Sequence, residues 1–284
     1  MSENTAKNPE STQFGTRDVE PDEKTALVRG VFDSVADNYD IMNDLMSGGI
    51  HRLWKDHLIR RIRPKAGLHY LDVAGGTGDI AFRINNKINA KMNSTGRQAA
   101  YGNNINSKAK EARRSPATLS ATKITLCDLN WDMLRVGRDR AIDRGNLDVF
   151  DWVTGNAETL PLEDESVDVY TIAFGLRNVT RIDNALKEAY RVLKPGGRFY
   201  CLEFSHVKNP TISNIYDKFS FNLIPKIGKL VAKDRESYQY LVESIRKMPT
   251  QEELKERLTQ AGFSKASYEN LTFGIAAIHS GFKL

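Results

Sequence analysis

Residues 71–79, Leu-Asp-Val-Ala-Gly-Gly-Thr-Gly-Asp, limit the folds open to this chain more than any other segment. A short apolar run enters a glycine-rich turn, and a helical pattern opens at residues 80–84. Glycine lets a backbone turn tightly and approach a ligand closely, because no Cβ is in the way. Such a turn places a ligand at the carboxyl end of a parallel strand and the start of a helix. The segment predicts an α/β fold with a nucleotide-like cofactor.

Two cofactors compete for this turn. Residues 76–81 fit the G-x-G-x-x-A pattern that seats the pyrophosphate of a dinucleotide. Residues 72–78 also fit the D-x-G-x-G-x-G pattern of S-adenosylmethionine methyltransferases, with Ala74 in place of the first glycine. S-adenosylmethionine has no phosphate and carries a sulfonium and an ammonium group. The Asp72 carboxylate suits that cation and would repel a pyrophosphate, so the turn favours S-adenosylmethionine.

Size and composition indicate one large globular domain. The chain has 284 residues, 40% of them hydrophobic and 27% charged, and no apolar run approaches the roughly 18 residues of a membrane span. Cys127 and Cys201 lie in apolar, strand-like runs. Two such thiols favour a reducing compartment, with neither a disulfide framework nor a metal cluster.

The basic charge of the chain is concentrated in one insert. In this kind of fold an acidic residue lies about 20 residues beyond the glycine turn and binds the ribose. Asp128 is the candidate, but it follows Gly78 by 50 residues. Residues 85–122 account for the excess, with seven Asn and a net charge of +6 against +5 for the whole chain. We expect a mostly disordered loop there, or alternatively a separate functional module, and no nucleic-acid partner.

Alternating elements predict a doubly wound, mostly parallel seven-stranded sheet with an antiparallel terminal hairpin, the Rossmann-like fold of class I methyltransferases. Strands are expected at 69–73, 123–127, 149–154, 167–174, 198–204, 267–271 and 274–279. Residues 1–24 are expected to be disordered and 25–284 to form the domain. Residues 190–194 also fit the Tyr-x-x-x-Lys of short-chain dehydrogenases. Asp72 and the terminal hairpin disfavour that nicotinamide oxidoreductase.

Several long motifs resemble the ubiquinone/menaquinone biosynthesis C-methyltransferase family. They are Tyr-Asp-Ile-Met-Asn at 39–43 followed by Ser47, His51 and Trp54; Arg-Val-Leu-Lys-Pro-Gly-Gly at 191–197 continuing to Leu-Glu-Phe-Ser at 202–205; and residues 174–180 and 237–245. The resemblance runs from about residue 28 to 284, interrupted only by 85–122. The ending at 277–284 and the position of the insert are most similar to the mitochondrial members.

The resemblance implies S-adenosylmethionine-dependent C-methylation of a polyprenyl benzoquinol ring in ubiquinone biosynthesis. The alternatives are a demethylmenaquinol methyltransferase and a scaffold protein of the quinone pathway. Implied partners are other coenzyme Q biosynthesis proteins in a multi-subunit complex, with a homodimer also considered. The implied location is peripheral, on the matrix face of the mitochondrial inner membrane, with bacterial-type cytoplasm as the alternative. Residues 219–231 are the candidate membrane contact, whereas the acidic N-terminus is not typical of a transit peptide.

The expected cofactor residues follow the strand ends. The glycine turn should wrap the amino-acid and ribose parts, and Asp128 should accept hydrogen bonds from the ribose hydroxyls. The resemblance implies that Asn156 and Ala157, after the third strand, contact the adenine. It also places Ala173 where bacterial members have a serine that contacts the cofactor. The cofactor-binding set is Asp72, Gly75, Gly76, Thr77, Gly78, Asp128, Asn156, Ala157 and Ala173.

The methyl acceptor is expected at the same edge of the sheet, next to Arg177 and Asn178. A guanidinium there would stabilise a phenolate, although Arg177 can equally pair with an acidic residue as structure. Tyr39 and Asp40 lie in a segment able to close over the site, and one of them would bind substrate or act as base. We interpret His51 as a core histidine in preference to a proton relay.

Overall fold

The computed structural model describes residues 12–14, 17–35, 44, 47–101, 122–207 and 235–284. Within them the strands are β1 (Thr12–Phe14), β2 (Arg17–Val19), β3 (His69–Val73), β4 (Lys123–Asp128), β5 (Phe150–Thr154), β6 (Val167–Ala173), β7 (Leu193–Phe204), β8 (Ser264–Leu271) and β9 (Ala276–Phe282). The helices are α1 (Pro21–Val35), α3 (His51–Ile62), α4 (Asp79–Tyr101), α7 (Trp131–Asp143), α8 (Ile182–Val192), α11 (Arg235–Lys247) and α12 (Gln251–Gln260).

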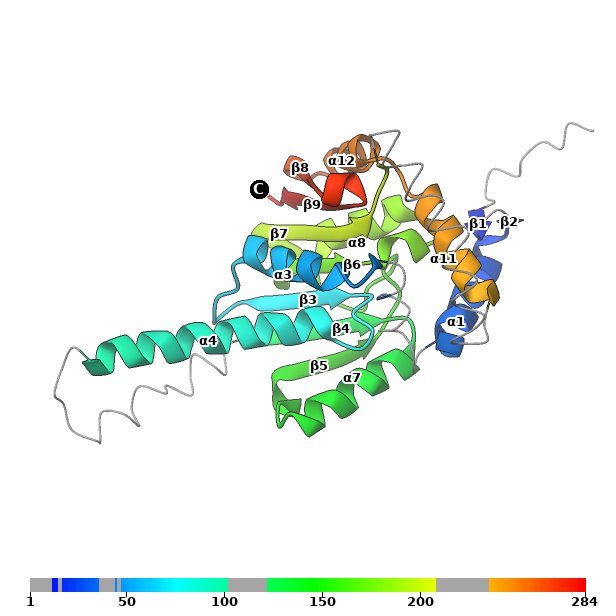
Figure 1. The fold of residues 1–284 in the computed structure, drawn as a ribbon. Coiled ribbons are helices and arrows are strands. Elements are labelled where there is room, and N and C mark those ends of the chain that lie inside the picture. Colours follow the sequence, from blue (N-terminus) through cyan, green and yellow to red (C-terminus); the bar gives the residue numbers. More distant parts are fainter. Residues whose placement is uncertain (1–11, 15–16, 36–43, 45–46, 102–121, 208–234) are drawn as a thin grey trace, which may run out of the picture.

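Seven strands form one sheet in the order β5-β4-β3-β6-β7-β9-β8 (Figure 1). The first five strands of that order are parallel, and β9 runs antiparallel to both β7 and β8. The sheet confirms the expected doubly wound fold with its reversed terminal strand. Strand β3 lies between β4 and β6. From β3 the chain adds β4 and β5 on one side and then crosses to add β6 and β7 on the other side. In such sheets a ligand crevice lies at the carboxyl end of the strand where the order reverses, which here is β3.

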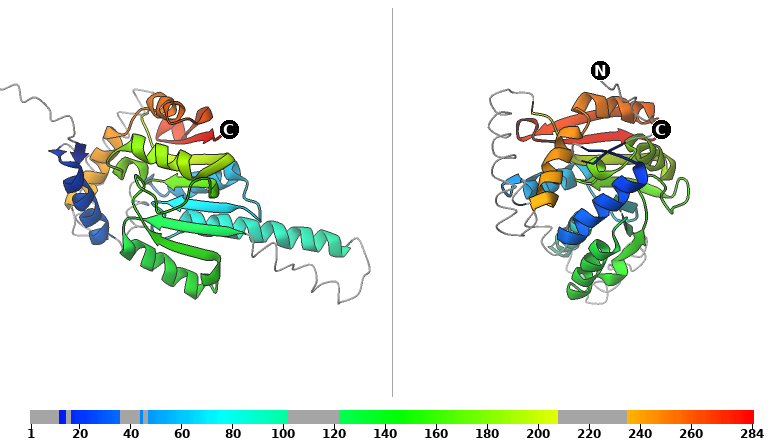
Figure 2. Two further views of the ribbon diagram at one scale, coloured as in Figure 1. Left: turned by 180° about the vertical axis from the view of Figure 1, so that it is seen from behind. Right: turned by 90° about the vertical axis from the view of Figure 1, so that its right-hand side faces the viewer.

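Helices cover both faces of the sheet, and strand alternation decides which side chains meet them. Tyr70 packs into the core with α3, α4 and α7, while its neighbour Leu71 packs into the core with α8 and α12. Helices α1 and α11 lie beyond the carboxyl ends of the parallel strands, at the right of Figure 1 and the left of the first view in Figure 2. They therefore lie over the predicted cofactor edge.

Helix α4 corrects the expected boundary of the insert. We expected a loop from residue 85, but the helix continues to Tyr101 and extends past the sheet (Figure 1). Ile84 and Ile88 are buried in the core and Met92 packs against it. These side chains recur every four residues, so one apolar stripe continues the helix through the Asn-rich sequence. Residues 102–121 lie outside the described part of the chain.

The N-terminal region also differs from the expectation of disorder over 1–24. Strands β1 and β2 pair antiparallel, and α1 begins at Pro21. The Phe14 ring stacks on Tyr240 with 4.2 Å between centroids. Thr12 Oγ1 donates to the Thr180 carbonyl, 3.3 Å away. Contacts with distant segments therefore order these short strands, which lack the length to be stable alone.

Asn130 before α7 and the Thr-x-x-Glu pattern at 250–253 before α12 predict two helix caps, and both are present. Asn130 accepts hydrogen bonds from the Asp132 and Met133 N–H groups at the start of α7. Thr250 and Glu253 form a reciprocal capping box on α12. Each cap satisfies backbone donors that the first helical turn leaves unpaired.

The Thr250 cap yields a test of stability. Thr250→Ala removes the hydroxyl that accepts the Glu253 N–H, so we expect the free energy of unfolding in urea to fall by about 1 kcal/mol. Thr259→Ala, on the exposed side of the same helix, is the matched control and should change it by less than about 0.5 kcal/mol. Equal effects of the two substitutions would contradict the assigned cap.

Candidate functional site

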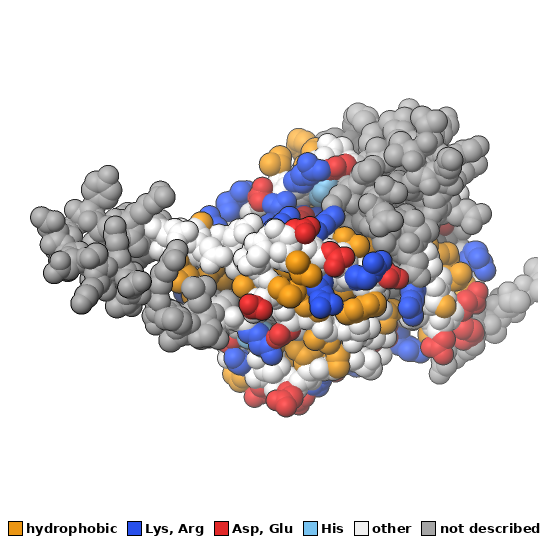
Figure 3. Space-filling view, turned by 90° about the horizontal axis from the view of Figure 1, so that it is seen from below, with side chains coloured by type: hydrophobic (Ala, Val, Ile, Leu, Met, Phe, Trp, Pro, Cys, Tyr) orange, Lys and Arg blue, Asp and Glu red, His pale blue; other side chains and the backbone are white. Residues whose placement is uncertain are grey.

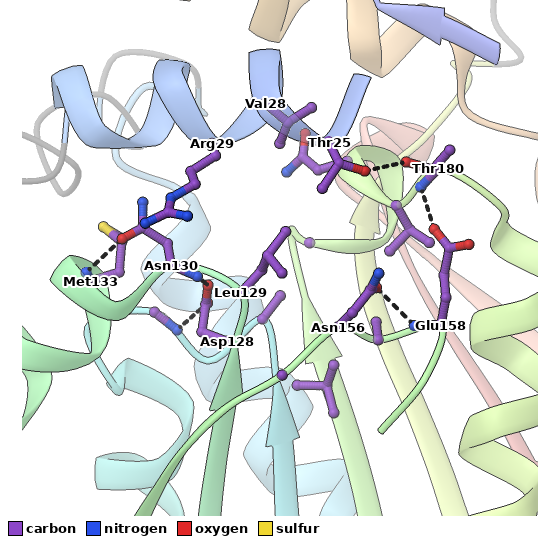
Figure 4. A pocket seen from close by; sticks show the side chains of 18 of the residues that line it. Thr25, Val28, Arg29, Asp128, Leu129, Asn130, Met133, Asn156, Glu158 and Thr180 are labelled. Atoms are coloured by element: carbon purple, nitrogen blue, oxygen red, sulfur yellow. Dashed lines mark hydrogen bonds between the residues drawn. The ribbon is translucent and has the colours of Figure 1, made fainter. Parts of the chain in front are cut away.

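A cavity opens at the carboxyl ends of the parallel strands, beneath α1 (Figure 4). It encloses about 820 Å³ of space between atoms, including its solvent-open mouth. Its walls come from the ends of four strands and from α1: Val73, Ala74 and Gly76 at the end of β3; Asp128, Leu129, Asn130 and Met133 at the end of β4; Gly155, Asn156, Ala157 and Glu158 after β5; Phe174, Gly175, Asn178, Val179 and Thr180 after β6; and Thr25, Val28 and Arg29 from α1.

The glycine turn has almost no room for side chains. A Cβ on Gly75 would lie 2.9 Å from the Asp72 carbonyl oxygen, and one on Gly175 would lie 2.4 Å from the Ala74 Cβ. Gly76 and Gly78 have positive φ angles of 49° and 84°. Glycine adopts these conformations without strain. The backbone therefore approaches the cavity closely, and of the turn's glycines only Gly76 lines it.

Asp128 forms one wall of the cavity. Its Oδ2 accepts the Gly76 N–H at 2.8 Å, and its Oδ1 accepts the Asn130 N–H at 2.9 Å. Burial raises the pKa of Asp128 to about 6, although these hydrogen bonds oppose the rise. Each carboxylate oxygen can accept a second hydrogen bond, so Asp128 is equipped to accept from a pair of hydroxyl groups.

Asp72 lies behind the turn and is 1% exposed. Thr171 Oγ1, opposite it on β6, donates to Asp72 Oδ1 at 2.8 Å. Oδ2 has no hydrogen bond of good geometry within the described residues. Burial raises the pKa of Asp72 to about 7, against the opposing hydrogen bonds from Thr171 and the Ala81 N–H. A buried carboxylate with a free oxygen suits a cationic ligand and opposes a pyrophosphate.

The remaining predicted cofactor residues divide into two groups. Asn156 and Ala157 line the cavity, and the Asn156 Oδ1 accepts the Glu158 N–H at 3.0 Å. Thr77 is buried, and Ala173 packs against the core one residue before the cavity wall. The glycine pattern thus marks residues that shape the turn as well as those that reach the cavity.

Sequence reasoning missed several cavity residues. Leu129, 37% exposed, and Met133 form an apolar wall beside Asp128, and Thr25, Val28 and Arg29 form the roof. Thr25 Oγ1 lies 3.3 Å from Thr180 Oγ1, which joins the roof to the wall (Figure 4). A leucine directly after the acidic strand end was the available signal for the wall. The roof depends on long-range packing and had none.

Arg177 pairs with an acidic residue, which was the alternative to a role in catalysis. Its side chain is fully buried, and Nη1 lies 2.6 Å from Glu203 Oε1 and donates to the Phe174 carbonyl at 2.7 Å. Its Nε and Nη2 have no hydrogen-bond partner in the part of the chain that the structure describes. The ion pair ties the segment after β6 to β7, and Arg177 retains unused donors.

Asn178 faces the cavity, and its Oδ1 accepts a hydrogen bond of 3.1 Å from Tyr240 Oη. The amide nitrogen is therefore the end of Asn178 left for a ligand. Burial raises the pKa of Tyr240, which keeps the phenol protonated as a donor. Tyr240 lies within the family-like motif 237–245, but we did not predict it as a site residue.

Two expectations concern the segment before α3. Tyr39 and Asp40 lie outside the described residues. His51 is 3% exposed, and its Nδ1 lies 2.9 Å from Ser47 Oγ and 3.6 Å from Asp44 Oδ1. Burial, with the nearby Lys55 charge, lowers the pKa of His51 to about 4. The imidazole is neutral near pH 7, in line with a core histidine.

The chain is similar to known proteins in both sequence and fold. A model of the ubiE/COQ5 methyltransferase family matches residues 19–283. A Pongo abelii protein named 2-methoxy-6-polyprenyl-1,4-benzoquinol methylase, mitochondrial, is 53% identical over 98% of this chain and 86% of its own length. The Arabidopsis thaliana protein of the same name is 52% identical over 96% and 91%. A Thermotoga maritima S-adenosylmethionine-dependent methyltransferase structure covers 90% of this chain and 100% of its own, with a TM-score of 0.58 and 17% identity, which shows a shared fold.

The raised pKa values of Asp72 and Asp128 predict how cofactor binding depends on pH. Because the folded pKa values of Asp72 and Asp128 lie above the usual value, the stability these groups contribute is present at low pH and lost as pH rises toward 7. Ionised Asp72 would bind the ammonium group of the cofactor, and ionised Asp128 would accept hydrogen bonds from its ribose hydroxyls. We therefore expect the Kd for S-adenosylmethionine, measured by calorimetry, to rise as the pH falls, by up to about tenfold per pH unit for each carboxylate once the pH is below its pKa.

Asp72→Asn should flatten that pH dependence, because it removes one of the two titrating groups. Asp151→Asn is the matched control, since Asp151 is half exposed on β5 and pairs with Lys123. It should keep the dependence of the unmodified protein. Affinity that is constant from pH 5.5 to 7.5 in the unmodified protein would contradict a role for either carboxylate.

Proposed function

Because this chain belongs to the ubiE/COQ5 methyltransferase family, we propose that it methylates a polyprenyl benzoquinol in ubiquinone biosynthesis. The reaction converts 2-methoxy-6-polyprenyl-1,4-benzoquinol to its 5-methyl product. Relatives named for this activity, about half identical to the chain and matched over nearly all of it, support the assignment.

S-adenosyl-L-methionine is the methyl donor, and the residues of the cavity fit it. The single observation that carries this choice is the pair of carboxylates around the glycine turn: Asp72 is buried behind the turn, and Asp128 is half-buried in the cavity wall. Asp72 would neutralise the ammonium end and Asp128 would accept the ribose hydroxyls, while Asn156 and Ala157 would border the adenine. The bound cofactor supplies an electrophilic methyl carbon on a sulfonium.

The methyl acceptor must be activated as a nucleophile. A quinol ring carbon is a weak nucleophile, and ionising the neighbouring phenol makes it more reactive. Asn178, held by Tyr240, can donate to a quinol oxygen and so stabilise the phenolate. Glu203 neutralises the charge of Arg177, so we assign Arg177 mainly to holding the segment after β6 in place. Its unused N–H groups give it a second, minor role as a donor to the quinol. Tyr39 and Asp40 remain the predicted residues for contacting substrate or accepting its proton.

We propose a mitochondrial location, because the relatives carry that name. None of the helices among the described residues is long and apolar enough to cross a bilayer. Peripheral contact with the inner membrane on its matrix face, through residues 219–231, is part of this proposal, as is assembly with other coenzyme Q biosynthesis proteins or as a homodimer. Residues 219–231 lie outside the described part of the chain.

The proposed reaction is tested with the purified chain, S-adenosylmethionine and a short-tailed 2-methoxy-benzoquinol, followed by mass spectrometry. We expect the acceptor to gain one CH₂ unit. Asp128→Asn should lose at least about tenfold in turnover, because it removes a charged acceptor at the cavity wall. A demethylnaphthoquinol serves as the rival acceptor. Preference for the naphthoquinol, or no methyl transfer to the benzoquinol by a chain that binds S-adenosylmethionine, would contradict the proposed substrate.

Tyr240→Phe tests the support of Asn178. The substitution keeps the ring stacked on Phe14 and removes only the hydroxyl that bonds Asn178. Loss of one hydrogen bond predicts a fall in kcat of about 2- to 10-fold, with the Kd for S-adenosylmethionine unchanged.

Tyr190→Phe is the control for that substitution, since Tyr190 packs against Phe263 on the opposite face of the sheet. It should leave kcat unchanged. A Tyr240→Phe protein with unaltered kcat would show that the phenol has no part in turnover.

A further inference from the structure

A second cavity lies on the α3 side of the sheet, toward the amino end of β7 and away from the cofactor edge. It shares no lining residue with the first cavity. Four arginines line it, and three residues that carry hydroxyl groups and one phenylalanine complete its walls. The lining is Arg60, Arg61, Arg63, Arg198, Tyr200, Ser267, Ser280 and Phe282.

The fold holds these arginines at one place. Arg60 and Arg61 belong to the last turn of α3, and Arg63 caps its end. Arg198 Nη1 donates to the Ile62 carbonyl at 3.0 Å, which joins the end of α3 to β7. Tyr200 Oη makes a long contact of 3.4 Å with the Arg61 carbonyl. The backbone of α3 therefore places the cluster against the sheet.

Positive charge exceeds negative charge around this cavity. Glu269 Oε2 lies 3.4 Å from Arg61 Nε, and its Oε1 lies 2.8 Å from His57 Nε2. Among the described residues, Glu269 is the one carboxylate that forms an ion pair with any of the four arginines. An arginine has five N–H donors, and the hydrogen bonds within the described residues occupy few of them. By contrast, the face seen in Figure 3 intersperses acidic and basic side chains among hydrophobic ones.

Arg63 adopts a backbone conformation in which a residue with a side chain is strained. Its φ of 52° and ψ of 61° lie in the left-handed region, where glycine or asparagine usually ends a helix. An arginine at this position accepts backbone strain and lines the cavity. Arg63→Asn therefore removes the charge while keeping a residue suited to the turn.

We propose that this cavity binds a phosphate group. Guanidinium forks match phosphate oxygens bidentately, and an anion relieves the repulsion among four like charges. Ser267 Oγ and Ser280 Oγ, 3.3 Å apart, supply additional hydroxyl donors. The Tyr200 and Phe282 rings give the site an apolar side. The ligand is a phosphomonoester or phosphodiester, carried either by a soluble compound or by a lipid headgroup.

Calorimetric titration with inorganic pyrophosphate tests the proposal, with sodium chloride at matched ionic strength as the reference. We expect saturable binding that Arg63→Asn and Arg198→Gln each weaken by about tenfold. Arg135→Gln is the matched control: it removes the same charge from an exposed position on α7 and should bind like the unmodified chain. Arg63→Asn should also leave the Tm unchanged or raised, so lost binding is not lost folding.

Vesicle sedimentation identifies the source of the phosphate. Binding to phosphatidylcholine vesicles that contain phosphatidylglycerol, lost in Arg63→Asn, indicates a headgroup; pyrophosphate binding without vesicle binding indicates a soluble ligand. The proposal is overturned if Arg63→Asn binds both probes like the unmodified chain, or if sodium chloride reproduces the pyrophosphate signal. Methyl transfer is measured in parallel, and its failure would concern the proposed function alone.

Discussion

The hydrogen bond from the Gly76 N–H to Asp128 Oδ2, 2.8 Å long, is the contact on which the cofactor side of this molecule depends. It joins the turn after β3 to the end of β4, and it exists because Val73 and Cys127 are paired in the parallel sheet. Gly76 donates from a left-handed conformation, and Ala74 in the same turn leaves no space for a Cβ at Gly175. Two strand ends thus hold a carboxylate and a bare backbone at one rim of the cavity.

The acceptor side is organised by a different interaction, the buried pair of Arg177 and Glu203. Removing two charges from water is costly, so such a pair is weak evidence for stability and better evidence for a defined geometry. It fixes the segment after β6 against β7, and Tyr240 then holds Asn178 from α11. The structure separates a residue that positions, Arg177, from one that faces the cavity, Asn178.

Local sequence signals were reliable where neighbours in sequence make the contacts. The Asn130 cap, the Thr250 capping box and the antiparallel pair at the end of the chain were all predicted, and all are present. The length of α4 was not, because an Asn-rich composition hid the four-residue spacing of Ile84, Ile88 and Met92. The hairpin of β1 and β2 was missed because its contacts are with Thr180 and Tyr240, far along the chain.

The sequence by itself determined the sheet, the glycine turn and the carboxylates that suit a cationic cofactor, since strand period, turn chemistry and motif spacing are written locally. Only the tertiary structure decided the roof of the cavity, the support of Asn178 by Tyr240, the burial of Arg177 and the placing of Arg63 and Arg198 around one cavity. Each of these joins segments separated by tens to hundreds of residues. Such contacts depend on how whole elements pack, and no periodicity within one segment encodes them.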